Sequence, residues 1–157
     1  MSTALRFLTI IAAVVLVALI LTPTLFAQSS AADVTLFNAA NRDRAAAGLS
    51  PLKWDEALAS AARQHAVRMA KANTISHQFP GEPALQDRAR HAGAHFSLVA
   101  ENVAEGPSVA GLHTQWMNSA PHRANLLDPQ LTAISISVVQ RGNTFFAVQD
   151  FSGTPGN

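Results

Sequence analysis

The sequence predicts an α+β domain in which helices are layered against an antiparallel sheet. After an apolar leader, segments with helical periodicity come first along the chain, separated by loops. Two short runs of strand-forming residues then flank Gly142-Asn143, a pair typical of a hairpin turn. Helices first and a hairpin last is the order expected of an α+β fold. The 157 residues leave room for one domain with a modest core.

The first 27 residues have the layout of an export signal. Arg6 precedes an uncharged run from Phe7 to Leu21, and small residues suited to cleavage follow up to Ala32. We expect cleavage after Ala27 or Ala32. The alternative is an uncleaved anchor, but the run is shorter than the roughly 20 residues that span a bilayer. Either way the domain is expected outside the cytoplasm, in the periplasm or the extracellular space.

Charge and cysteine content exclude several classes of protein. Arg6 lies in the leader, so the rest of the chain holds 11 − 1 = 10 basic residues against 10 acidic ones. This balance gives no electrostatic footprint for nucleic acid. The chain has no cysteine, so it carries neither disulfides nor a lipid on an N-terminal cysteine. We expect a monomer that meets a membrane only through the leader, if that segment stays uncleaved.

Two helices are expected in the first half of the domain. The first covers residues 33–47, capped by Asp33 and closed by Gly48, with Asn41 and Arg44 tying it to a neighbouring loop. The second covers residues 55–73 and places His65 on an apolar stripe. His65 is therefore expected to be a core histidine with a backbone partner rather than a ligand.

The middle of the chain alternates loops and short elements. Ile75–Pro83 has two prolines and no periodicity, so His77 is expected on a loop. A short helix from Ala84 to His91, closed by Gly93, and exposed side chains at His91 and His95 are expected next. In the apolar run Leu98–Ala104, Glu101 is either turned outward or buried and paired, because burial without a partner would be too costly.

The last third holds one more helix, a bend and the hairpin. Ser108 is expected to cap a helix with Trp116 inside, and Pro121 to break it so that His122 stands at a bend. Both Trp54 and Trp116 are expected to be buried. Alternation over Thr132–Gln140 predicts a half-buried strand, paired with a second strand over Thr144–Phe151, and Ser152–Asn157 shows no packing signal.

Several motifs follow one another along the whole domain. In chain order they are Asn41-x-x-Arg44-x-x-x-Gly48-Leu49-x-x-Leu52-x-Trp54, Ala62-x-x-His65-Ala66-x-x-Met69-Ala70, His77, Arg88 with Gly93, Glu101-Asn102-Val103-Ala104, Trp116-Met117-Asn118-Ser119-x-x-His122-Arg123-x-Asn125-Leu126-Leu127 and Val148-Gln149-x-Phe151. Together they resemble the CAP superfamily of cysteine-rich secretory, antigen 5 and pathogenesis-related 1 proteins, most of all its bacterial, cysteine-free SCP-domain branch. The resemblance implies an α-β-α sandwich with a small antiparallel sheet, spanning residues 33–152 and followed by a short flexible tail at 153–157.

The resemblance also implies a central cleft lined by two histidines and two acidic residues. The matching positions are His77, Glu101 and His122, while Ser119 stands where eukaryotic members have the second glutamate. In several members such a cleft holds a divalent metal such as zinc, so His77, His122 and Glu101 are its expected ligands here. A neutral Ser119 predicts weak binding, which should fade towards pH 5 because protonated imidazole cannot ligate.

Three functions are compatible with this pattern. The one we favour is a secreted, non-enzymatic binding module for a small apolar or cell-envelope ligand. The alternative is a metal-dependent hydrolase that uses His77, Glu101 and His122. A third is a nucleophile set of Ser119, His122 and Glu101, although no glycine-rich elbow or oxyanion donor accompanies it. No catalytic residue is assigned from the sequence.

Overall fold

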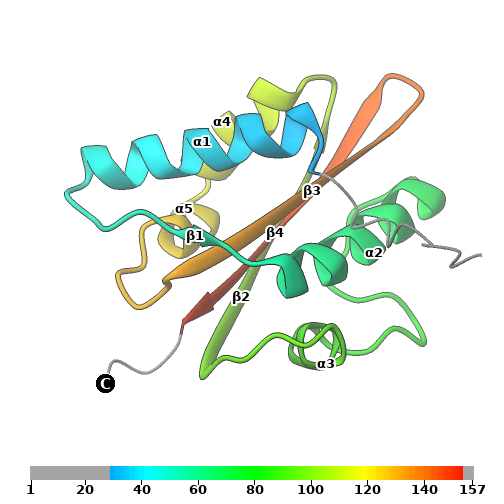
Figure 1. The fold of residues 1–157 in the computed structure, drawn as a ribbon. Coiled ribbons are helices and arrows are strands. Elements are labelled where there is room, and N and C mark those ends of the chain that lie inside the picture. Colours follow the sequence, from blue (N-terminus) through cyan, green and yellow to red (C-terminus); the bar gives the residue numbers. More distant parts are fainter. Residues whose placement is uncertain (1–28, 154–157) are drawn as a thin grey trace, which may run out of the picture.

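The computed structural model describes residues 29–153 (Figure 1). The predicted leader, and the tail beyond residue 153, lie outside the described residues. The elements in chain order are α1 (Ala31–Ala46), β1 (Lys53–Trp54), α2 (Glu56–Ala72), α3 (Leu85–His91), β2 (Leu98–Gly106), α4 (Val109–Asn118), α5 (Ala120–Leu126), β3 (Ala133–Arg141) and β4 (Thr144–Gly153).

The four strands form one sheet in the order β1-β3-β4-β2. The hairpin of β3 and β4 is antiparallel, as the sequence predicts, and β2 pairs antiparallel with β4 along its whole length. β1 is only two residues long and pairs parallel with β3, so the sheet is mixed rather than purely antiparallel. β2 closes the opposite side of the sheet, where it is the edge strand.

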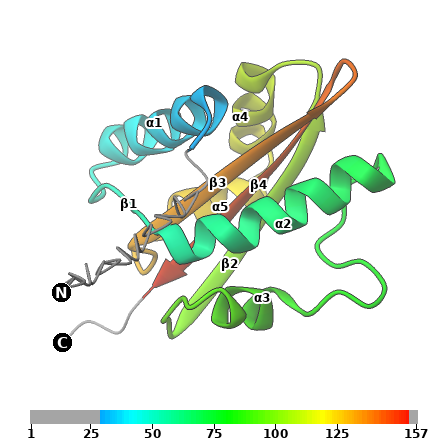
Figure 2. The same cartoon turned by 45° about the vertical axis from the view of Figure 1, so that its right-hand side comes forward.

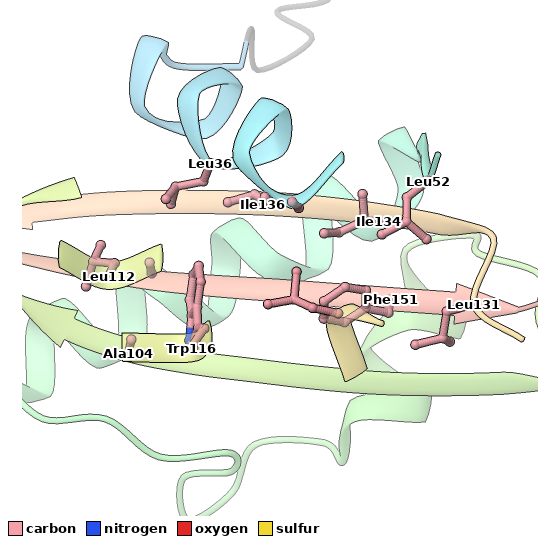
Figure 3. Packing of buried hydrophobic residues seen from close by; sticks show 12 residues of the cluster. Leu36, Leu52, Ala104, Leu112, Trp116, Leu131, Ile134, Ile136 and Phe151 are labelled. Atoms are coloured by element: carbon pink, nitrogen blue, oxygen red, sulfur yellow. The ribbon is translucent and has the colours of Figure 1, made fainter. Parts of the chain in front are cut away.

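Helices cover both faces of the sheet, which confirms the α-β-α sandwich. Figures 1 and 2 show α1, α4 and α5 on one face and α2 and α3 on the other. Trp116 is fully buried and packs with Leu36 from α1, Leu112 from α4 and Phe151 from β4 in the larger apolar cluster (Figure 3). A second cluster joins Met69 of α2 to Phe146 and Val148 of β4 on the opposite face.

β3 is a strand, as predicted, but the expectation that one of its faces is exposed to solvent is wrong. Ser135 and Ser137 alternate with apolar residues, which favours one solvated face, yet both serines are buried. The helix α2 covers that face, and the Ser135 hydroxyl donates a hydrogen bond to the backbone carbonyl of Asp55. The small Ser135 side chain thus lets a helix approach the sheet closely while its hydroxyl stays bonded.

The start of α1 differs slightly from expectation. Ser30 is the N-cap, and its hydroxyl accepts from the amide of Asp33, whose carboxylate accepts in turn from the Ser30 amide. Asp33 therefore completes a capping box instead of capping alone. Its other oxygen accepts from the amide of Val138, so the first turn of α1 is bonded directly to β3.

The expected tie between α1 and a loop is confirmed. Asn41 makes two hydrogen bonds with the backbone of Leu52. Arg44 is buried and donates to four backbone carbonyls, those of Ser50, Leu126, Asp128 and Leu131. This side chain joins loop segments that lie far apart in the sequence.

Three further details complete the fold. β4 continues through Ser152 and Gly153, beyond the expected end at Phe151, and both residues are buried. Trp54 is only half-buried, because it belongs to the short strand at the sheet edge. None of the helices within residues 29–153 is long and apolar enough to cross a membrane.

Candidate functional site

The edge strand β2 places two consecutive polar residues on opposite faces of the sheet. Side chains alternate along a strand, so Glu101 lies on the same face as Val103, under α2, and Asn102 lies on the same face as Ala104, under α4 and α5. Both residues are buried. Glu101 holds the part of the candidate site that contains His77, and Asn102 holds the part that contains His122.

Glu101 is paired with a histidine and an arginine, which confirms that it is buried and paired. One carboxylate oxygen accepts from Nδ1 of His77 at 2.9 Å, and the other is bonded to the guanidinium of Arg88. Arg88, from α3, also donates to the backbone carbonyl of His77 at 3.0 Å. The loop that carries His77 is therefore fixed to β2 through both its side chain and its backbone.

A second buried pair supports this loop from below. His65 of α2 is fully buried, with Nδ1 2.9 Å from the carboxylate of Glu82 and Nε2 2.6 Å from the carbonyl of Ser76. The prediction of a core histidine with a backbone partner is confirmed. Burial opposes ionisation of Glu82, but its bonds to His65 and to the amide of Phe79 outweigh that, so its pKa is lowered.

The side chain of Asn102 is bonded to the backbone of the second site histidine, His122. The Asn102 amide donates to the carbonyl of His122 and to the side-chain oxygen of Gln149, each at 3.0 Å, and accepts from Asn125 of α5 at 2.9 Å. The predicted break lies slightly earlier than expected: α4 ends at Asn118, and Pro121 sits in the first turn of α5. His122 therefore belongs to a helix, because proline needs no hydrogen-bond partner for its nitrogen there.

His77 and His122 are close enough to influence each other's charge. The hydrogen bond to Glu101 raises the pKa of His77, outweighing its partial burial and the nearby Arg88. Burial lowers the pKa of His122, and the charge of His77 lowers it further. The two imidazoles are thus tuned in opposite directions, so near neutral pH His77 holds a proton more readily than His122 does.

Ser119 occupies the junction between α4 and α5 and is half-buried. Within the described part of the chain, no hydrogen bond joins its hydroxyl to His122. A serine nucleophile needs its base within hydrogen-bond reach. The arrangement gives no support to a nucleophile set of Ser119, His122 and Glu101.

Glu101 is poorly placed to act as a metal ligand. Among residues 29–153, no three histidine or acidic side chains are arranged to hold one. Both oxygens of Glu101 are engaged, and the guanidinium of Arg88 on one of them opposes a second cation. We therefore assign no metal ligand here, and zinc binding stays a prediction of the resemblance.

Two hollows lie elsewhere on the domain. One, of about 780 Å³, runs along α2 from Trp54 to Lys71 and is also lined by Asp33 of α1 and by Ser137 of β3. The other, of about 430 Å³, separates α2 from α3 and is lined in part by Arg68 and His91. Neither is lined by His77, Ser119 or His122. At the site, the exposed ring of His77 and the half-buried ring of His122 lie beside the buried ion pair of Glu101 and Arg88.

Comparison with known proteins agrees with this fold. The family model of the cysteine-rich secretory protein (CAP) family matches residues 37–151, and the chain belongs to that family. The chain is 32% identical over 125 residues to the uncharacterized protein YkwD of Bacillus subtilis, a match that covers 79% of this chain and 48% of YkwD.

Solved structures give the same picture. An extracellular protein of Bacillus anthracis that contains an SCP domain is 33% identical, with a TM-score of 0.71 over 78% of this chain and 40% of that protein. An outer surface protein of Borrelia burgdorferi shares the fold at 21% identity, with a TM-score of 0.73 over 79% of this chain and 93% of its own. The chain spans less than half the length of YkwD and of the B. anthracis protein.

Proposed function

We propose that the domain is a non-enzymatic binding module that works outside the cytoplasm and holds an anionic group of a cell-envelope ligand between His77 and His122. The observation that carries this proposal is the engagement of both Glu101 oxygens, one by His77 and the other by Arg88. A carboxylate engaged on both oxygens is not available as a base or nucleophile. It acts instead as a fixed support that orients His77.

The ligand chemistry follows from the free ring nitrogens. The His77 side chain is 62% exposed, and its Nδ1 is committed to Glu101, which leaves Nε2 for a ligand. When His77 is protonated, Nε2–H is a charged donor, and charge-assisted hydrogen bonds favour carboxylate or phosphate oxygens. Arg88 beneath the loop neutralises the charge of Glu101, so that this carboxylate does not repel an anion at His77. These features favour an anionic group over an apolar one, and neither hollow adjoins the two histidines.

Anion titration tests this site directly. Acetate and inorganic phosphate are added to the purified domain while the histidine ring signals are followed by NMR. We expect saturable shifts of His77 and His122, strengthening as the pH falls and His77 gains its proton, because the pKa of His77 is raised. His77→Ala and His122→Ala should each weaken binding about tenfold or more, the loss expected for one charge-assisted bond.

His95→Ala is the matched control, since His95 is an exposed histidine outside the site. It should bind both anions as the wild type does. Equal binding by the wild type and both site variants would show that the histidines do not form the site. Native mass spectrometry of protein purified from its own exported compartment then identifies which envelope molecule supplies the anionic group.

The fold also favours one of the two expected cleavage positions. Cleavage after Ala32 would remove Ser30 and destroy the capping box that begins α1, a loss of about 1 kcal/mol or more. Cleavage after Ala27 keeps the helix start intact. We expect N-terminal sequencing of the exported protein to begin at Gln28. Recovery of Asp33 would contradict this choice, and intact Met1 on membrane-bound protein would support the anchor instead.

A further inference from the structure

One buried acidic group beside the site has no role in the binding proposal. Asp150 of β4 lies directly across from Glu101 on β2 and from Ser135 on β3. It is completely buried, and neither of its carboxylate oxygens receives a hydrogen bond from any donor within the described residues. A carboxylate without donors in a protein interior is costly, so its protonation state has to be explained.

The neighbours of Asp150 direct their hydrogen bonds to other acceptors, and the one buried Arg88 donor without a partner, Nε–H, is not bonded to Asp150 either. The hydroxyl of Ser135 donates to the carbonyl of Asp55. The terminal nitrogens of Arg88 are directed at Glu101 and at the carbonyls of His77 and Pro83. The charged and titratable groups that face this cluster are Glu101 from β2, Arg88 from α3, His65 from α2, and Glu82 and His77 from the loop between α2 and α3.

Two physical effects favour the neutral form of Asp150. Burial is the larger one, and the negative charge of Glu101 is the second; together they raise the pKa of Asp150 well above its usual range, while Arg88 only partly opposes them. A neutral carboxyl has one O–H to donate. The oxygens of Glu101, its cross-strand neighbour, are the acceptors that suit it.

We propose that Asp150 is a positioning residue. Its carboxyl stays protonated, and the O–H donates a hydrogen bond to Glu101. This bond holds Glu101 in the orientation that binds His77 and Arg88. No atom is transferred, because the pair simply shares one proton and one negative charge, which Arg88 balances. This inference rests on the proposed function in so far as His77 is the group that is positioned.

The proposal has a consequence for stability. A carboxyl whose pKa is raised by folding contributes fully below its unfolded pKa of about 3.9, and that contribution is lost as the pH rises towards its folded value. The contribution of Asp150 to the stability of the wild type should therefore decrease between acid and neutral pH. Asp150→Asn removes the titration but keeps a donor for Glu101, so its melting temperature should equal or exceed that of the wild type at neutral pH.

Three measurements test the proposal together. Carbon-13 NMR of aspartate-labelled wild type should show one carboxyl still protonated at pH 7, and it should vanish in Asp150→Asn. The His77 ring should titrate in Asp150→Asn as it does in the wild type. In Asp150→Leu, which has a similar branched shape but no donor, the His77 pKa should fall towards its ordinary value, because Glu101 is no longer held beneath Nδ1.

An ionised Asp150 at pH 7 would overturn the proposal, and so would an unchanged His77 titration in Asp150→Leu. If Asp150→Leu does not fold, the carbon-13 signal and Asp150→Asn still decide the matter. These readouts need no ligand. A failure of anion binding with a protonated Asp150 would therefore reject the proposed function and leave the role of Asp150 standing.

Discussion

Replacing Trp116 with alanine is expected to lower the free energy of unfolding by about 3–5 kcal/mol, the usual cost of deleting a large buried aromatic side chain. Trp116 is fully buried where α4 meets the sheet, and it belongs to the larger apolar cluster, which joins α1, α4 and α5 to the strands. The cavity left by alanine cannot close, because the sheet on one side and α1 on the other are held by their own bonds. Urea denaturation followed by circular dichroism measures the loss.

Two further variants sharpen this test. Trp54→Ala should cost less, because Trp54 is only half-buried and packs edge-to-face on Phe37 at the sheet edge. Trp116→Phe should also cost less than Trp116→Ala, since it keeps most of the ring and removes an indole N–H that has no partner among the described residues. An unchanged melting temperature for Trp116→Ala would contradict the packing of α4.

The periodic elements of this fold could be predicted from the sequence. The stripe on α2 that contains His65, the hairpin around Gly142 and the caps at Asp55 and Ser108 all depend on residues a few positions apart. Local spacing determines such features, so they need no knowledge of the tertiary structure. The bonds of Asn41 and Arg44 to distant loops were predicted in kind but not in their partners.

The strands covered on both faces could not be predicted in the same way. β2 is an apolar run without alternation, because α2 and α3 lie over one face and α4 and α5 over the other. Ser135 and Ser137 suggested a solvated face that α2 in fact buries. β1 is too short to leave a pattern, and its parallel pairing with β3 follows only from the tertiary fold.

The candidate site, too, could be predicted only in part. Resemblance indicated His77, Glu101 and His122, and the structure brings Glu101 to His77 by a direct bond and connects His122 to the same strand through Asn102. It does not bond Ser119 to His122. The roles of Glu82 and Asp150 were missed, because each depends on a partner 17 or more positions away. The signal that could have indicated Asp150 is an acidic residue inside a predicted strand, between Gln149 and the apolar Phe151.

Replacing Arg88 with methionine is expected to be as costly as losing Trp116, about 3–5 kcal/mol, because it leaves a buried carboxylate without its cation. The Arg88 side chain is only 6% exposed, and it joins Glu101 of β2 to the carbonyls of His77 and Pro83. Methionine keeps most of the aliphatic stem, so the loss reports on the charge and the hydrogen bonds rather than on packing.

Arg90→Met is the matched control on the same helix. Arg90 is 62% exposed, lies 4.0 Å from Asp87 and stacks over Phe96, so its loss should cost no more than about 1 kcal/mol. The double variant Arg88→Met with Glu101→Gln should recover part of the loss, because a neutral amide needs no counter-charge. Equal unfolding free energies for Arg88→Met and Arg90→Met would show that Arg88 is not the cation that stabilises Glu101, and the ionic base of the site would have to be reassigned to His65 and His77.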